Sequence, residues 1–215
     1  SLMFAKFSPD GRRVAYVSEH NLYVEEISTG NINKLTRDGS RKVINGTFDW
    51  VYEEEFGCRD GFRWSPDGSK IAFWQVDASK IRDYYMLNTT DSNYSQVIPV
   101  EYPKVGESPS PTKIGVVSID NGYIRWMDIE GDPAQNYLPR MAWAGLNELI
   151  IQQLDRKQQE SKLKYCNVTD GSSRTFWAEN SEAWVDLNSA DIFGEPGGWQ
   201  WVNKGLDFIW VSEKD

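Results

Sequence analysis

FSPDG at residues 7–11 recurs as WSPDG at residues 64–68, so one turn motif occurs twice in the chain. Proline favours the backbone angles of the first central position of a β-turn, and glycine accepts the positive φ found in many turns. Each copy is closely followed by a basic residue and an apolar stretch, within residues 12–17 and 69–74. This order predicts a tight turn that leads into a β-strand.

Two weaker copies of this unit follow later in the chain. They are AWAGLN at residues 142–147 before an apolar stretch at 148–153, and WVNKGL at residues 201–206 before a stretch at 207–212. Further short alternating stretches, typical of hairpin strands, occupy residues 21–24, 32–36 and 162–168. Short strands that recur in units of four, with one aromatic turn motif per unit, indicate a β-propeller.

The two strong copies begin at Phe7 and Trp64, 64 − 7 = 57 residues apart, which is long for one blade, so we expect insertions between strands. The length accommodates roughly three to four blades, whereas a propeller normally has at least four. We therefore predict an all-β fold, a partial β-propeller of several four-stranded antiparallel blades. The proline-rich residues 98–111 are expected to be extended or turning and to link two blades.

The chain of 215 residues carries 23 Lys and Arg against 32 Asp and Glu, a formal net charge of −9. This acidic balance argues against a protein that follows nucleic-acid phosphates, and no nucleic-acid partner is expected. No apolar run approaches the roughly 20 residues that cross a membrane, and no amino-terminal leader is recognisable. Because the sequence starts at Ser1 and reads as mid-domain from there, we expect a piece of a longer protein.

Histidine and cysteine are scarce in this chain. His20 is the only histidine, so a Ser-His-Asp or Cys-His enzyme would have to use it, and a His-rich metal site is excluded. The favoured interpretation of His20 is an ordinary surface or turn histidine. Cys58 and Cys166 lie far apart in the sequence, and either a disulfide or two free thiols fits this spacing. We predict no cofactor and no metal site.

One segment departs from the strand pattern. DWVYEEEF at residues 49–56 contains three consecutive glutamates between aromatic residues, which suits a short helical turn or loop better than a strand. Three interpretations fit: a solvated acidic turn, carboxylates that converge on one ammonium group, or a divalent-metal site. The third is weak, because other suitably spaced oxygen ligands are missing.

The same segment resembles the signature of the dipeptidyl peptidase IV family of serine exopeptidases. Residues 64–73, 99–106 and 208–215 resemble further stretches of that family, in the same order. The resemblance implies an eight-bladed propeller followed by an α/β-hydrolase domain that removes dipeptides, with Pro or Ala second, from free amino termini. It also implies that Glu54 and Glu55 bind the α-ammonium group of the substrate, whereas Glu53 is expected to be structural.

The catalytic half of such an enzyme is not found in this sequence. A hydrolase domain needs a G-x-S-x-G nucleophile motif followed along the chain by Asp and then by His. No such motif occurs here, and His20 lies upstream, where it cannot be the last member of that series. We therefore interpret residues 1–215 as a fragment of the amino-terminal propeller domain, without catalytic residues and inactive alone. Its role would be to bind the peptide's amino terminus and to gate access to the hydrolase domain.

The expected partners are peptides with a free amino terminus and the protein's own carboxy-terminal hydrolase domain. We expect the parent to be a homodimer, a bacterial member of the family, located in the periplasm or otherwise outside the cytoplasm. The alternative is a non-catalytic propeller of the WD40 or TolB type that serves as a protein-binding scaffold. An arc of blades cut from a ring exposes strand edges, so the isolated chain is expected to self-associate or to rearrange locally.

Overall fold

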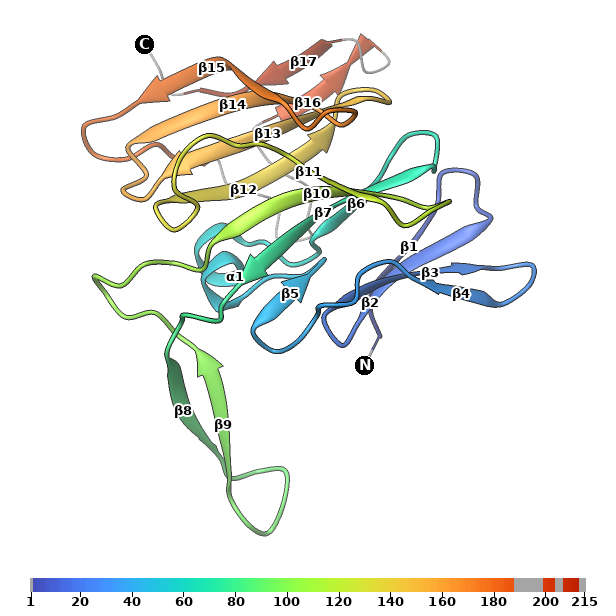
Figure 1. The fold of residues 1–215 in the computed structure, drawn as a ribbon. Helices are drawn as coiled ribbons and strands as arrows, with labels where there is room; N and C mark the ends of the chain where they lie inside the picture. The colour runs from blue at the N-terminus through green and yellow to red at the C-terminus, as the bar shows by residue number, and fades with distance from the viewer. Residues whose placement is uncertain (1, 188–198, 204–206, 213–215) are drawn as a thin grey trace.

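The structure, a computed structural model, describes residues 2–187, 199–203 and 207–212. Within them the fold is antiparallel β-sheet with one short helix, which confirms the all-β prediction (Figure 1). The first sheet contains four strands in chain order. They are β1 (Leu2–Phe7), β2 (Arg13–Ser18), β3 (Asn21–Glu26) and β4 (Asn31–Lys34). FSPDG forms the predicted turn between β1 and β2, where the N–H of Gly11 donates to the carbonyl of Ser8 at 2.9 Å.

A second sheet with the same order lies later in the chain. Its strands are β12 (Asn136–Trp143), β13 (Glu148–Asp155), β14 (Glu160–Asn167) and β15 (Ser173–Asn180). The weak copy at residues 142–147 joins β12 to β13, as predicted. The last weak copy falls at the hairpin of β16 (Trp199–Val202) and β17 (Asp207–Trp210), although residues 204–206 lie outside the described part of the chain.

The sheet between these two is interrupted by insertions. It contains β5 (Val43–Asn45), β6 (Phe62–Trp64), β7 (Lys70–Asp77), β10 (Thr112–Ser118) and β11 (Ile124–Trp126). β5 and β6 both pair with β7, β5 near its carboxy-terminal end and β6 near its amino-terminal end. They are therefore two halves of one edge strand. Residues 46–61 leave that edge and return to it, and they carry the helix α1 (Trp50–Phe56).

The position of α1 corrects one expectation. The sequence places the acidic segment after one blade and before the next, because only the WSPDG copy marks the second unit. The structure places it inside the second unit, since β5 already belongs to that sheet. The predicted helical turn itself is confirmed over Trp50–Phe56. No helix within the described residues is long and apolar enough to span a membrane.

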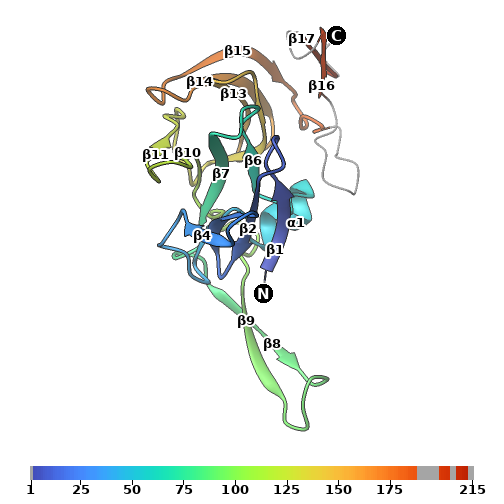
Figure 2. The ribbon, with the colours of Figure 1, turned by 90° about the vertical axis from the view of Figure 1, so that its right-hand side faces the viewer.

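A second insertion separates β7 from β10. It is the hairpin of β8 (Asp83–Asn88) and β9 (Gln96–Glu101), which projects away from all the sheets (Figures 1 and 2). The prediction that residues 98–111 link two blades is wrong. These residues end the hairpin and return to β10 of the same sheet. Pro99 is tolerated in β9 because, among the described residues, β9 pairs with β8 alone and its other edge needs no backbone donor.

The hydrophobic cores lie between neighbouring sheets. Strand β7 contributes Phe73 to the core shared with the first sheet and Trp74 to the core shared with β12 and β13. Successive strand residues point to opposite faces, so the middle sheet is buried on both faces. This explains why β7 is almost continuously apolar instead of alternating.

The aromatic residues before the turns also connect the sheets. The indole N–H of Trp64 donates to the carbonyl of Lys6 at 3.2 Å, and that of Trp143 donates to the carbonyl of Arg63 at 3.1 Å. In both cases the acceptor immediately precedes the aromatic residue of the preceding unit, Phe7 or Trp64. The repeated motif therefore sets the contact between one sheet and the next as well as the turn.

Candidate functional site

Helix α1 has a defined start and a defined end. Asp49 precedes it, and its Oδ1 accepts the backbone N–H of Tyr52 at 3.1 Å, which satisfies a donor that the first turn leaves free. Gly57 follows it in the left-handed conformation, with φ 65°, which glycine adopts without steric cost. Three glutamates in a row are compatible with this geometry, because glutamate is a good helix former.

The start of the helix is anchored to the middle sheet. The hydroxyl of Ser110, two residues before β10, donates to Oδ2 of Asp49 at 2.6 Å, and both side chains are buried. Burial raises the pKa of Asp49 above its usual value, while its hydrogen bonds from Ser110 and Tyr52 act in the opposite direction. The carboxyl group is therefore held in place on both of its oxygens.

The middle of the helix is anchored to the next sheet. Tyr52 is completely buried, and its hydroxyl oxygen accepts the backbone N–H of Leu138 in β12 at 3.0 Å. Burial raises the pKa of Tyr52 far above its usual value, so this hydroxyl stays neutral. The ring packs against Phe48 and Tyr137, with centroids 5.5 Å and 6.1 Å away. Helix α1 is thus fixed between two sheets.

The three glutamates have three different environments. Glu53 is half-buried and lies 3.9 Å from Nη1 of Arg59, and its burial raises its pKa. Glu54 is exposed, and its side chain makes no hydrogen bond or ion pair with any residue that the structure describes. Glu55 is exposed as well, but its Oε1 accepts a hydrogen bond from Nε2 of Gln158 at 2.6 Å. The two glutamates implicated by the resemblance are therefore both exposed in the last turn of the helix, but only Glu55 has a hydrogen-bonding partner among the described residues.

A cavity of about 280 Å³ lies beside Glu55. Aromatic rings form much of its wall, and Trp50 and Tyr102 pack with centroids 4.2 Å apart. The guanidinium of Arg156 lies 5.7 Å from the ring centroid of Tyr137 and donates to the carbonyl of Glu107 at 3.2 Å. The lining residues are Trp50, Val51, Glu55, Tyr102, Pro103, Lys104, Val105, Glu107, Pro109, Tyr137, Arg156 and Gln158.

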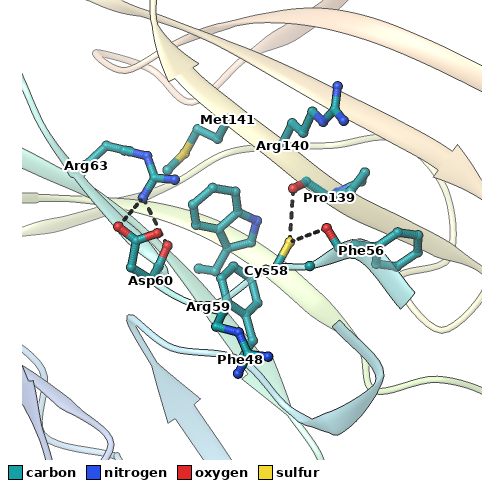
Figure 3. Close-up of a pocket in the computed structure, with 11 residues that line it drawn as sticks. Phe48, Phe56, Cys58, Arg59, Asp60, Arg63, Pro139, Arg140 and Met141 are labelled. Carbon is teal, nitrogen blue, oxygen red and sulfur yellow. Dashed lines mark hydrogen bonds and ion pairs between the residues drawn. The ribbon is translucent and has the colours of Figure 1, made fainter. Parts of the chain in front are cut away.

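A second pocket lies after the helix, around Cys58, and Figure 3 shows it. Its cavity volume is about 30 Å³, which suits water and not a peptide side chain. The thiol of Cys58 donates to the carbonyl of Pro139 at 3.3 Å, and burial raises the pKa of Cys58 to about 12. A thiol with so high a pKa is a poor nucleophile.

The remaining candidate residues do not join this site. Cys58 and Cys166 are both free, so the disulfide alternative is wrong. His20 lies in the turn between β2 and β3 with φ 60°, as expected of a turn histidine. Within the described residues, no three His, Cys, Asp or Glu side chains are arranged to hold a metal ion.

Two contacts of the site are not predictable from the sequence pattern. Gln158 lies 103 positions after Glu55, in the turn between β13 and β14, and nothing in the local sequence marks it. Ser110 lies in the stretch expected to link blades, 61 positions after Asp49. Both meet α1 only because separate sheets converge on it.

Known proteins resemble this chain in fold and in sequence. The family profile described as the dipeptidyl peptidase IV (DPP IV) N-terminal region matches residues 1–215. The chain belongs to the dipeptidyl peptidase IV family. The crystal structure of Porphyromonas gingivalis dipeptidyl peptidase 4 superposes with a TM-score of 0.89 at 29% identity, over 100% of this chain and 30% of that one. The sheets described above are therefore part of the propeller region of this family.

Curated relatives within the dipeptidyl peptidase IV family differ in their stated activity. The "Probable dipeptidyl-aminopeptidase B" of Talaromyces marneffei is 29% identical over 97% of this chain and 24% of its own length. The "Inactive dipeptidyl peptidase 10" of Rattus norvegicus is 26% identical over 91% of this chain and 25% of its own length. The chain thus spans about a quarter of the length of these relatives.

Proposed function

We propose that this chain is the substrate-binding part of the propeller domain of a serine-type dipeptidyl peptidase, which releases Xaa-Pro and Xaa-Ala dipeptides from peptide amino termini. Glu54 and Glu55 bind the α-ammonium group of the substrate. The observation that carries this proposal is the pair of exposed carboxylates in the last turn of a helix that is held at its start and at its middle. Family membership supports the same function.

The physical logic favours an ammonium group as the ligand. An ammonium nitrogen has three donors and no acceptor, so it satisfies two carboxylates at once. Each charge-assisted hydrogen bond contributes about 1.5–3 kcal/mol. A clamp at a fixed distance from a nucleophile sets how many residues are removed, and it converts binding energy into orientation at the scissile bond. The rigid anchoring of α1 is what such a clamp requires.

The chemistry belongs to a hydrolase domain outside residues 1–215, which in this proposal supplies the nucleophilic serine, the aspartate and the histidine. The propeller part binds and positions the peptide and gates access, and it is inactive alone. No cofactor takes part. An extracytoplasmic location for the parent stays a prediction.

A non-catalytic scaffold is the competing function. It is favoured by one observation, the similarity to a rat relative whose name describes it as inactive. A scaffold would share the fold and the packing of α1, because both depend on buried residues such as Tyr52. The two functions differ in whether the full-length protein cleaves peptides and, if it does, in whether Glu54 and Glu55 matter for turnover.

The experiment uses the full-length protein and a chromogenic Ala-Pro amide, with its amino-acetylated form as the second substrate. We expect cleavage of the free amine only, and a fall in kcat/KM of roughly 10- to 150-fold in Glu54→Gln and in Glu55→Gln, the loss of one charge-assisted bond. Glu53→Gln is the matched control and should stay within about twofold, because Glu53 is not part of the proposed clamp and makes only a long contact of 3.9 Å with the exposed Arg59.

Other outcomes would redirect the proposal. Wild-type turnover in both glutamine variants would overturn the clamp. Cleavage of the acetylated substrate would indicate an endopeptidase or acylaminoacyl peptidase. Failure to cleave either substrate would favour the scaffold.

We infer further that the parent is a homodimer in which a second copy covers the β8–β9 hairpin. An isolated two-stranded hairpin is marginally stable in water, yet this one exposes apolar side chains on both faces. Tyr85 and Leu87 lie on one face, and Tyr84 and Met86 lie on the other. Its base is fixed by ion pairs from Arg41 and Lys42 to Asp83 and Glu101. A fixed, apolar projection suits a symmetric contact with a second copy.

A further inference from the structure

The turn between β13 and β14 is unusually well defined. Asp155 accepts the backbone N–H groups of Gln159 and Glu160 on its Oδ1, at 2.7 and 2.8 Å. The N–H of Gln158 donates to the carbonyl of Asp155 at 3.0 Å. A turn with this many internal hydrogen bonds places the side chains it carries in a fixed direction.

Two contacts fix the turn to the rest of the molecule. The guanidinium of Arg156 donates to the carbonyl of Glu107, in the segment before β10, at 3.2 Å. The carbonyl of Gln158 accepts the backbone N–H of Val185 at 2.7 Å. The turn is therefore held on both sides, next to the cavity that Glu55 lines.

Gln158 has a backbone conformation that its residue type does not favour. Its φ is 57°, in the left-handed region, where glycine and asparagine are the residues usually found. Either of those would form this turn at lower cost, so the turn alone does not account for glutamine. The side chain supplies a reason, because its Nε2 donates to Oε1 of Glu55 at 2.6 Å.

We propose that Gln158 is a positioning residue, which fixes the carboxylate of Glu55 in the orientation that receives the substrate's α-ammonium group. This inference rests on the proposed function. The amide of Gln158 donates to Oε1 of Glu55, and no described residue donates a hydrogen bond to Oε2. Because the amide is neutral, it orients the carboxylate and leaves its negative charge in place. A lysine or arginine at the same place would neutralise that charge. No side chain in the described part of the chain supports Glu54 in this way, so the two glutamates act differently: Glu55 is preset, and Glu54 adjusts.

The test is a set of variants in the full-length protein, assayed with the free Ala-Pro amide. Gln158→Asn keeps the amide and tolerates the left-handed backbone, but its side chain is one methylene shorter and does not reach Glu55. We expect kcat/KM to fall by about 2- to 10-fold, the cost of ordering one freed side chain, mainly through KM and without a change in melting temperature. Gln158→Lys places an ammonium beside Glu55, and its loss should match that of Glu55→Gln.

Gln159→Asn is the matched control. Gln159 undergoes the same chemical change one position along, but its amide donates to the carbonyls of Glu182 and Ala183 and not to Glu55. Its kcat/KM should stay at the wild-type value. An equal loss in Gln159→Asn and Gln158→Asn would overturn the positioning role and indicate a general disturbance of the turn.

A double-mutant cycle with Glu55→Ala separates this inference from the proposed function. If Gln158 acts through Glu55, Gln158→Asn should have no further effect in the Glu55→Ala background. Wild-type turnover in Glu55→Ala would disprove the clamp itself. A normal Gln158→Asn variant beside a crippled Glu55→Ala variant would disprove only the role of Gln158.

Discussion

The backbone N–H of Gly61 donates to the carbonyl of Gly46 at 2.9 Å. This bond joins the two ends of the insertion that carries α1, and we call the junction of Gly46 and Gly61 the neck. Both glycines also bond to the backbone of Trp74 in β7. The N–H of Gly46 donates to the carbonyl of Trp74 at 2.9 Å, and the N–H of Trp74 donates to the carbonyl of Gly61 at 3.0 Å. The edge strand is therefore interrupted opposite a single residue of β7, Trp74. All the residues between the two glycines leave and return at that point.

The neck has no room for a side chain at Gly61. A Cβ atom there would lie 2.7 Å from the carbonyl carbon of Gly46 and 2.9 Å from the nitrogen of Thr47, both backbone atoms that cannot rotate away. We predict that Gly61→Ala lowers the free energy of unfolding by about 1–3 kcal/mol or more, the usual range for overpacking. We also expect it to impair cleavage of the Ala-Pro amide, because α1 must move. Chemical denaturation and the amide assay measure the two effects.

Gly57→Asn is the control for this prediction. Gly57 also belongs to the insertion and has a positive φ, but a Cβ there meets nothing within 4 Å. Asparagine tolerates the left-handed conformation, so a cost below about 1 kcal/mol is expected. If Gly61→Ala were as mild as Gly57→Asn, the neck would not be what places the helix.

The neck also illustrates what the sequence can and cannot predict. Pro and Gly dictate local backbone geometry, so the FSPDG and WSPDG copies correctly predict turns and the strands that follow them. β5 and β6 are three residues each, too short for alternation to be detected, and their register depends on β7. The interruption of an edge strand is therefore invisible until its partner strand is known.

The candidate site also combines features that the sequence predicts with contacts that it does not. Glu54 and Glu55 follow from a contiguous motif, and the helical turn follows from the preferences of glutamate. The side chains that contact this helix and the residue before it come from distant parts of the chain: Ser110 precedes β10 of the same sheet, and Gln158 follows β13 of the next sheet. Such contacts depend on tertiary packing, which no local pattern encodes.

Asp49 leads to a prediction about pH. Burial raises its pKa in the folded state above the usual 3.8, so the folded protein keeps this proton at pH values where the unfolded chain has released it. The contribution of Asp49 to stability is therefore complete below about pH 4 and is lost as the pH rises through the raised pKa. Asp49→Asn does not titrate, and asparagine is an equally good residue before a helix.

The measurement compares thermal unfolding of full-length wild type and Asp49→Asn between about pH 4 and pH 7. We expect the melting temperature of the wild type, relative to the variant, to fall as the pH rises and then to level off. The opposite trend would mean that the hydrogen bonds from Ser110 and Tyr52 outweigh burial and that the folded-state pKa of Asp49 is lowered.

The hairpin leads to a prediction about assembly. Leu87 is 63% exposed and pairs across the strands with Val97, which is 62% exposed, so one face of the hairpin presents adjacent aliphatic side chains to solvent. If a second copy covers this face, Leu87→Glu buries an unpaired charge in the interface and should convert the full-length dimer into a monomer, as light scattering coupled to gel filtration would show. Gln96→Glu adds the same charge at a polar position of β9 and should leave the dimer intact. A wild-type protein that is already monomeric, or a Leu87→Glu variant that stays dimeric, would show that the hairpin is not the contact between copies.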